Sequence, residues 1–262
     1  MVYLIFLIVS FGASIAGAIC GIGGGVIIKP ALDAVGVLDV ATISFLSGCT
    51  VLTMSCYSVY KAKRSGESLI DMKIGTPLAI GAAVGGVVGK WMFQMVSSMF
   101  ADKNMVGAVQ AACLLVITLG TLIYTIYKEK IHTKHLVNFA VCLLVGLVLG
   151  IMSSFLGIGG GPINLVVLFY FFSMDTKTAA QNSLYIILFS QITSFLQTVL
   201  TGKVPAFPIM ALVIMVFGGL MGGFYGRIIN KKMDSKMVDK LFICLMVVII
   251  GINCYNIYKF IG

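Results

Sequence analysis

Long apolar stretches recur along this chain, and short polar or basic segments separate each from the next. Each stretch is long enough, or nearly so, to cross a bilayer as a helix, which takes about 20 apolar residues. The stretches are rich in Leu, Ile, Val, Met and Gly, without the alternating pattern of membrane β-strands. The pattern predicts an all-α polytopic membrane protein. The predicted spans are Val2–Cys20, Val40–Tyr60, Ile74–Lys90, Met105–Tyr127, Leu136–Leu156, Thr178–Leu200, Ala206–Tyr225 and Met237–Ile261.

Composition agrees with this class. The 262 residues are 60% hydrophobic and only 10% charged, whereas soluble domains carry about 25% charged residues. The net charge of +9 is mostly loop lysine, which in a membrane protein sets orientation and does not indicate nucleic-acid binding.

The seven cysteines lack metal-ligand spacing and are interpreted as packing residues, so we expect no metal and no cofactor. The first apolar stretch lacks a basic leader, which favours a structural helix over a secretion signal.

The chain contains an internal repeat. Residues 21–25 and residues 157–161 both read Gly-Ile-Gly-Gly-Gly, and a short apolar segment follows each motif. Those short segments are Val26–Leu38 and Pro162–Met174. Ala41-Thr42-Ile43-Ser44 also corresponds, by sequence likeness, to Ala180-Gln181-Asn182-Ser183.

A second marker supports the same duplication. Gly81, Gly85 and Gly89 precede Lys90, and the same spacing returns 137 positions later in Gly218, Gly222 and Gly226, which precede Arg227. Glycines four apart share one helix face, so we interpret these two triads as helix-packing surfaces. The predicted units are a first membrane repeat, 1–127, a cytoplasmic linker, 128–135, and a second membrane repeat, 136–262.

Charge decides between two topologies of the repeats. If each glycine motif lies within a single span, the halves are parallel and Lys and Arg divide almost evenly between the two sides. If the chain turns back at the glycines, the halves are inverted, and thirteen basic residues share one side while Lys90, Lys103, Lys203 and Lys259 lie opposite. The positive-inside rule favours the second topology, with about four full spans plus a short half-helix per repeat and both termini extracellular.

Three successive glycines inside a membrane segment expose backbone groups that hydrocarbon cannot satisfy, so they should be packed in protein or line a polar cavity. Pro162 suits a helix start, and Pro30 falls near the first turn of its own segment. Two half-helices that begin at mid-membrane offer free N–H groups and positive dipole ends to an anion. The alternative is that the glycines only permit close helix packing.

Lys29 lies about one turn into the first half-helix, where a cation is disfavoured unless it has a partner. Either a bound anion relieves that cost, or the side chain reaches an interface; the sequence leaves both open. Polar residues of the following spans could complete an anion shell. The candidate substrate-binding residues are Gly23, Gly24, Gly25, Lys29, Ser44, Gly159, Gly160, Gly161, Asn164, Gln181, Asn182 and Ser183.

Three other ionisable residues each allow two interpretations. Lys90 and Arg227 occupy matched positions close to predicted span ends, and interfacial anchoring is favoured over substrate contact for both. Asp33 is the sole candidate for proton coupling near the core, or else it marks the end of its short helix.

These motifs resemble those of the sulfite exporter TauE/SafE family of membrane anion transporters. The resemblance rests on Gly-Ile-Gly-Gly-Gly in each half, the proline that follows, the Ala-Thr-x-Ser-like start of the next span and the glycine-rich third span. It covers nearly the whole chain and implies secondary transport of sulfur oxyanions or organosulfonates, often outward, across a bacterial or archaeal plasma membrane. Two departures stand out: Lys29 replaces a usually apolar or small residue, and Pro162 comes earlier in its copy than Pro30 does.

A transporter is therefore the predicted function, with a small anionic substrate and the lipid bilayer as partners. An enzyme would need a positioned base, nucleophile or metal, and no catalytic set is found in the apolar spans. His132 and His135 lie in a lysine-rich connector. The alternative function is an anion channel or a non-transporting membrane module. The anion itself, the coupling ion and the oligomeric state stay open.

Overall fold

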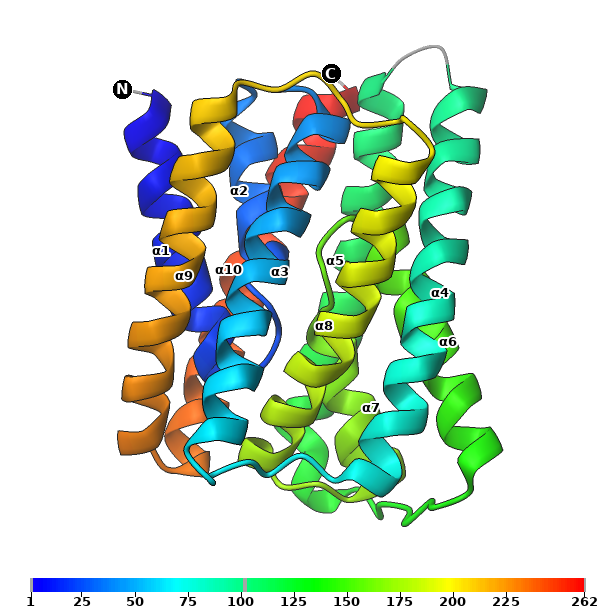
Figure 1. Ribbon diagram of the computed structural model, residues 1–262, viewed down its shortest axis with the longest axis vertical. Coiled ribbons are helices and arrows are strands. Elements are labelled where there is room, and N and C mark those ends of the chain that lie inside the picture. Colours follow the sequence, from blue (N-terminus) through cyan, green and yellow to red (C-terminus); the bar gives the residue numbers. More distant parts are fainter. Residues whose placement is uncertain (1, 101–102, 262) are drawn as a thin grey trace.

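The computed structural model describes residues 2–100 and 103–261, and within them the chain forms a bundle of α-helices that run along one axis (Figure 1). Eight of the described helices are long and apolar enough to cross a membrane. The protein is thus a polytopic all-α membrane protein. The helices are α1 (Val2–Cys20), α2 (Gly25–Val35), α3 (Val40–Arg64), α4 (Met72–Met99), α5 (Lys103–Tyr127), α6 (Phe139–Leu156), α7 (Pro162–Phe172), α8 (Thr176–Leu200), α9 (Ile209–Lys232) and α10 (Ser235–Ile261), with a 3₁₀ turn η1 (Lys128–Lys130) after α5.

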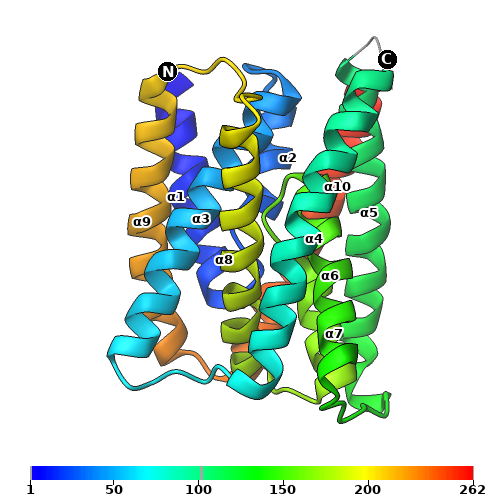
Figure 2. The same ribbon diagram turned by 45° about the vertical axis from the view of Figure 1, so that its right-hand side comes forward.

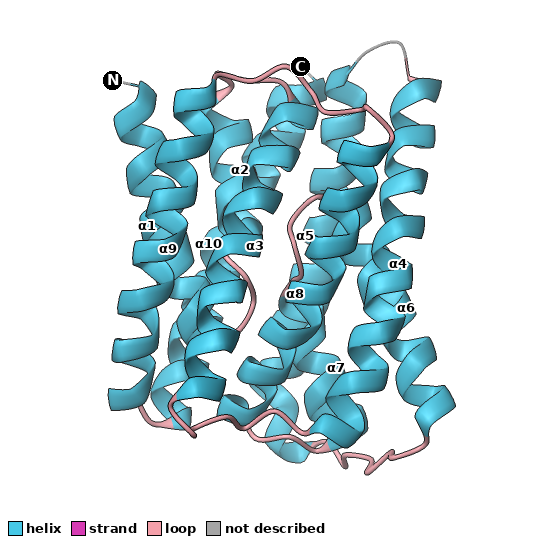
Figure 3. Ribbon diagram, in the orientation of Figure 1, coloured by secondary structure: helices cyan, strands magenta, loops and turns pink. Residues whose placement is uncertain are grey.

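Helices α2 and α7 are the two short members, and each begins at a loop buried at mid-height among the long helices (Figure 3). Gly21 and Gly157 end the preceding helices in the left-handed region, with φ of 75° and 67°. Glycine adopts such φ values without strain. Pro162 occupies the start of α7 as expected, whereas Pro30 lies inside α2 and not in its first turn. Two half-helices therefore start near the middle of the bundle.

The spans that follow the half-helices begin at equivalent aspartates. Asp39 accepts a hydrogen bond from the backbone N–H of Thr42, and Asp175, 136 positions later, accepts one from Thr178. A side-chain acceptor at this position satisfies an orphan N–H of the first helical turn. The caps set the register between the halves, so Ser44 corresponds to Ala180. The match of Ser44 with Ser183 that sequence likeness suggested is therefore wrong by three residues.

The two glycine triads lie at helix contacts, which confirms their interpretation as packing surfaces. Along α4, a methyl group at Gly81, Gly85 or Gly89 would overlap backbone carbonyls of α6. Along α9, the glycines of the second triad face α1 in the same way. Each triad thus joins a helix of one half of the chain to the first helix of the other half, and α4–α6 and α1–α9 pack more extensively than the other described helix pairs (Figure 2).

Both ends of the described chain, Val2 and Ile261, lie at one end of the bundle, which we call the termini face (Figures 1 and 2). The opposite end, called the basic face, carries the basic clusters Lys61–Arg64, Lys128–Lys134 and Arg227–Lys232 at the ends of α3, α5 and α9. Helix α1 runs from the termini face towards the basic face, and α6 runs the other way.

Candidate functional site

The two glycine turns meet at the centre of the bundle. A methyl group at Gly25 would overlap the carbonyl oxygen of Ile158, and one at Gly23 would lie 3.3 Å from the carbonyl oxygen of Gly159. Only glycine lets the two backbones approach so closely. The turns that carry Gly23, Gly24, Gly25, Gly159, Gly160 and Gly161 are therefore brought together, although they lie more than 130 positions apart in the chain.

A narrow polar cavity begins at Gly157 and extends towards the termini face. It has about 20 Å³ of free space, room for roughly one water molecule. Ser44 of α3 sits against Gly157, and its Oγ has no hydrogen-bond partner within residues 2–100 and 103–261. The lining residues come from α3, α4, α6, the turn and α8: Ser44, Phe45, Gly48, Cys49, Lys90, Ser154, Gly157, Gln191, Ser194, Phe195 and Thr198.

Lys90 supplies the charge of this narrow cavity. Its side chain is buried, with 8% of the residue exposed, and its Nζ lies 5.2 Å from the ring centroid of Phe93. Among the described residues, no carboxylate pairs with Lys90 and no carbonyl accepts a hydrogen bond from it. A cation in a membrane interior is costly unless something compensates it. Lys90 is therefore a buried cation beside hydroxyl and amide groups, and the interfacial anchoring expected for it is wrong.

A second and wider cavity, of about 300 Å³, opens at the basic face between α1, α3, α8 and α9. It is lined by the other ends of the helices that line the narrow cavity: Ser58, Val59 and Ala62 of α3, and Lys177, Gln181 and Leu184 of α8. Arg227 and Lys231 of α9 give it positive charge, and Glu67 lies at its mouth. The volume is that of a small-molecule binding pocket.

The two cavities have equivalent linings. Seven positions in the lining of the wide cavity have a counterpart 136 or 137 positions away in the lining of the narrow cavity. Ala18, Ser58, Val59, Ala62, Gln181, Leu184 and Arg227 correspond to Ser154, Ser194, Phe195, Thr198, Phe45, Gly48 and Lys90. A basic side chain thus lies at the same matched position of the glycine-rich helix in each cavity, Arg227 of α9 in the wide one and Lys90 of α4 in the narrow one.

Lys29 has a partner within its own helix, which neither sequence-based interpretation included. Its Nζ donates to Asp33 Oδ2 at 2.6 Å, one turn further along α2, and both side chains are 4% exposed. A methyl group at Gly157 would lie 3.6 Å from Lys29 Cε, so the aliphatic part of the side chain does reach the second turn. The ammonium group, however, is compensated by Asp33 and does not reach an interface.

The remaining predicted residues divide into two groups. Gln181 and Asn182 hydrogen-bond the loop between α3 and α4: Gln181 Oε1 accepts from the N–H of Leu69 at 2.9 Å, and Asn182 Nδ2 donates to the carbonyl of Leu69 at 3.1 Å. Asn164 and Ser183 are buried, and their side-chain polar atoms have no partner in the part of the chain that the structure describes.

Sequence reasoning left out the cation and most of the polar lining of the narrow cavity, above all Lys90, Gln191, Ser194 and Thr198. A signal was present, because Lys90 and Arg227 stand at matching places after their glycine triads. The predicted span, however, stopped at Lys90, whereas α4 continues to Met99. Nine more helical residues move Lys90 away from the helix end and into the membrane-spanning part.

Comparisons with known proteins agree with this architecture. The family model of the sulfite exporter TauE/SafE matches residues 6–253. The chain is 24% identical over 287 aligned residues to the probable membrane transporter protein YunE of Bacillus subtilis (strain 168), with 99% of this chain and 98% of that protein covered. No solved structure matches it significantly. The chain belongs to the sulfite exporter TauE/SafE family, and it is a multi-pass membrane transporter of a small substrate and not an enzyme.

Proposed function

We propose that this transporter carries a small anion, a sulfur oxyanion or an organosulfonate, outward across the plasma membrane, with the substrate held between the glycine turns of two repeats. The observation that carries the proposal is Lys90, a buried cation without an acidic partner in the described chain, beside a cavity with hydroxyl and amide groups. An anion would compensate that charge and accept hydrogen bonds from Ser44, Gln191 and Ser194. The family description supplies the sulfur chemistry and the outward direction.

The equivalent cavities support a mechanism in which the site opens to one side at a time. The wide cavity opens at the basic face, the narrow one points to the termini face, and the touching glycine turns lie between them. Opposite directions of α1 and α6 favour inverted repeats, 1–127 and 136–262 (Figure 1). In such transporters one repeat rocks against the other around a central site. The positive-inside rule then makes the basic face, with linker 128–135, cytoplasmic and the termini extracellular.

The sizes of the two cavities indicate which side of the transporter is open in this conformation. With about 300 Å³ on the basic face and about 20 Å³ on the termini face, the protein is open to one side and constricted on the other. A small oxyanion fits the wide cavity, whereas the narrow one must widen to release it. A carrier is favoured over a channel because the backbone contact between Gly25 and Ile158 separates the two cavities.

Anion binding to the purified protein tests the proposal. Thermal unfolding is measured with sulfite, thiosulfate, sulfate, sulfoacetate, chloride and neutral taurine, because a ligand that binds the native state raises stability as its concentration rises. We expect a sulfur oxyanion or an organosulfonate to stabilise the wild type and Lys90→Met to remove the effect. Lys240→Met, which removes an exposed lysine, should retain it. Stabilisation by none of these compounds, or equal stabilisation of Lys90→Met, would contradict the proposal.

A further inference from the structure

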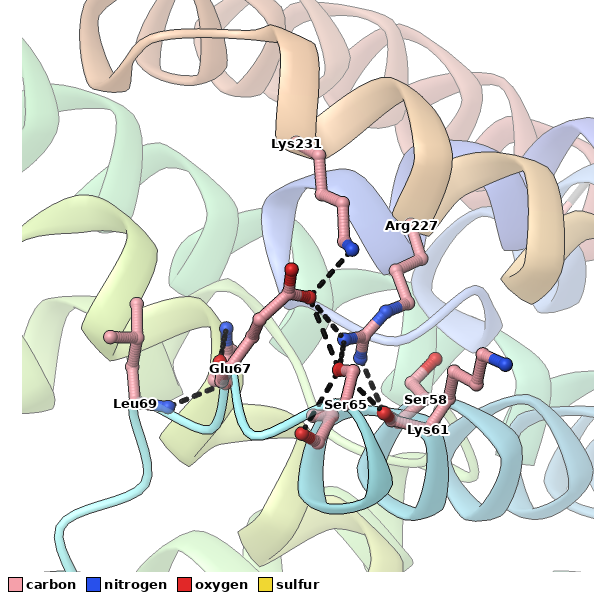
Figure 4. A network of polar contacts seen from close by, with 9 residues as sticks. Ser58, Lys61, Ser65, Glu67, Leu69, Arg227 and Lys231 are labelled. Carbon is pink, nitrogen blue, oxygen red and sulfur yellow. Dashed lines mark hydrogen bonds and ion pairs between the residues drawn. The ribbon is translucent and has the colours of Figure 1, made fainter.

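The loop between α3 and α4 places Glu67 at the mouth of the wide cavity, where several donors converge on one carboxylate oxygen (Figure 4). Lys231 Nζ lies 2.6 Å from Glu67 Oε2, Arg227 Nη2 lies 3.1 Å from it, and Ser65 Oγ donates to it at 3.1 Å. Arg227 also donates to Ser65 Oγ at 2.7 Å. A guanidinium, an ammonium and a hydroxyl around one oxygen form an oxyanion-binding arrangement.

Helix α8 holds the rest of this loop from the opposite side of the cavity. Gln181 and Asn182 bind the backbone of Leu69, and Gln181 Nε2 also reaches the carbonyl oxygen of Glu67 at 3.5 Å. Gly66, with φ of 67°, makes the turn that directs Glu67 towards α9. The backbone position of Glu67 is therefore fixed independently of its carboxylate, which alone makes the ion pairs to α9.

The equivalent loop on the termini face has the opposite charge. Ser65-Gly66-Glu67 corresponds to Thr201-Gly202-Lys203, and both glycines have left-handed φ values, 67° and 64°. Lys231 corresponds to Gln94, and Lys203 Nζ donates to Gln94 Oε1 at 3.1 Å. The contact is thus preserved between the halves, but of these two loops, as far as the structure describes their surroundings, only the one on the basic face brings a carboxylate to the basic side chains. Lys90, which corresponds to Arg227, is left unpaired among the described residues.

We propose that Glu67 is a built-in competitor of the transported anion: its carboxylate occupies an oxyanion subsite formed by Arg227, Lys231 and Ser65, and an incoming anion must displace it. The inference rests on the proposed function, since it requires an anionic substrate that enters the wide cavity. It adds a substrate subsite and a residue that tunes access to it. The ligand class is an oxyanion with at least one terminal oxygen that can accept from both a guanidinium and an ammonium group.

A competitor of this kind lowers the apparent affinity for the substrate, because only the fraction of molecules with a displaced Glu67 can bind it. Half of the side chain of Glu67 is exposed, so its ion pairs are weakened by solvent, and their loss should change the affinity by roughly fivefold at most. Such a contact holds the subsite closed to weakly binding anions, yet a better oxyanion can replace it.

Isothermal titration of sulfite, thiosulfate and sulfate into the purified full-length protein tests the inference. We expect Glu67→Gln to lower the Kd of the bound anion by roughly fivefold. Adding Arg227→Met to Glu67→Gln should reverse that gain. The matched control is Glu129→Gln, which removes the same charge from an exposed turn on the same face and should leave the Kd unchanged.

Each result separates the inference from the proposed function. If Lys90→Met abolishes binding but Glu67→Gln leaves the Kd unchanged or raises it, Glu67 only fastens the loop; the inference is then overturned, while the proposed function stands. A fastening role would also lower the unfolding temperature of Glu67→Gln without changing affinity. If none of the three anions binds either the wild type or Glu67→Gln, the inference fails, and the proposed function fails for sulfur oxyanions.

Discussion

Lys29 and Asp33 form a buried ion pair inside α2, with 2.6 Å between Nζ and Oδ2. Helix α10 covers the pair's end of α2: Asn256 donates to the carbonyl of Pro30, and Lys259 donates to the carbonyls of Asp33 and Ala34. Asp33 Oδ1 has no partner in the described chain. The pair is thus internal to the half-helix. Asp33 compensates the positive charge of Lys29, which a substrate anion was one candidate to compensate.

Removing only one member of this pair should destabilise the protein strongly. Lys29→Met leaves Asp33 buried without its cation, which costs about 3–5 kcal/mol. The double variant Lys29→Met/Asp33→Leu removes both charges and should recover most of the lost stability. Thermal unfolding in detergent measures both. Equal loss in the single and double variants would show that the pair does not stabilise α2.

Lys90 should have the opposite effect on stability from Lys29. Because no acid compensates Lys90 among the described residues, Lys90→Met removes an uncompensated buried charge. A lysine at the centre of a membrane helix costs about 2.5–3.5 kcal/mol, so the ligand-free variant should unfold at a higher temperature than the wild type. A lower unfolding temperature would indicate a structural role for Lys90 and would weaken its assignment to the substrate.

The contact between the glycine turns predicts a steep cost at Gly25. Gly25→Ala places a methyl group on the carbonyl oxygen of Ile158, and overpacking of this kind costs about 1–3 kcal/mol even where neighbours can move. Gly12→Ala is the control, because its added methyl group has no atom within 4 Å. Detergent-solubilised yield and unfolding temperature should fall for the first variant only.

The contacts of Glu67 also fix the pH range in which it acts. Hydrogen bonds from Lys231 and Ser65, together with the charge of Lys231 and a hydrogen bond from Arg227, hold the pKa of Glu67 below its usual range. The stabilisation from a lowered pKa is present above the unfolded value and is lost as pH falls through the folded value. Lys61 of α3 and Lys177 of α8 are the other charged side chains near this loop that Figure 4 or the cavity lining shows.

We therefore expect the ratio of sulfate affinities between Glu67→Gln and the wild type to be the same at pH 7.5 and about pH 5.5. Sulfate is the suitable probe, because it does not titrate in that range. Calorimetry at the two pH values measures the ratio. A smaller ratio at the lower of these pH values would mean that Glu67 is already being protonated there, against the contacts observed.

The sequence predicted those features that backbone chemistry dictates. The length of the apolar stretches predicted the membrane spans. The two Gly-Ile-Gly-Gly-Gly motifs predicted two breaks in the helices, and the structure brings these breaks into contact. The charge pattern grouped the basic segments on one side because lysines cluster at helix ends, and the structure has Lys61–Arg64 and Arg227–Lys232 on the same face.

What it could not predict depends on helix length and on side-chain pairing. Lys90 looked terminal because the next residues, Trp91 to Met99, are mixed in character, although they continue α4. Lys29 looked uncompensated, although Asp33 lies one turn away, because four-residue spacing only permits an ion pair and does not require one. Gln181 and Asn182 lie at the start of a span, and only the tertiary fold places the loop of Leu69 beside them.

The most direct test of the central claim is counterflow of labelled sulfite in proteoliposomes preloaded with unlabelled sulfite. The account predicts saturable uptake by the wild type and by Lys240→Met, and its loss in Lys90→Met. Thiosulfate and an organosulfonate replace sulfite in parallel vesicles, so the substrate class is covered. Two results would contradict the claim that this protein carries a small oxyanion through the Lys90 site. One is flux that rises linearly with concentration, and the other is uptake that, for every one of these anions, equals that of empty vesicles.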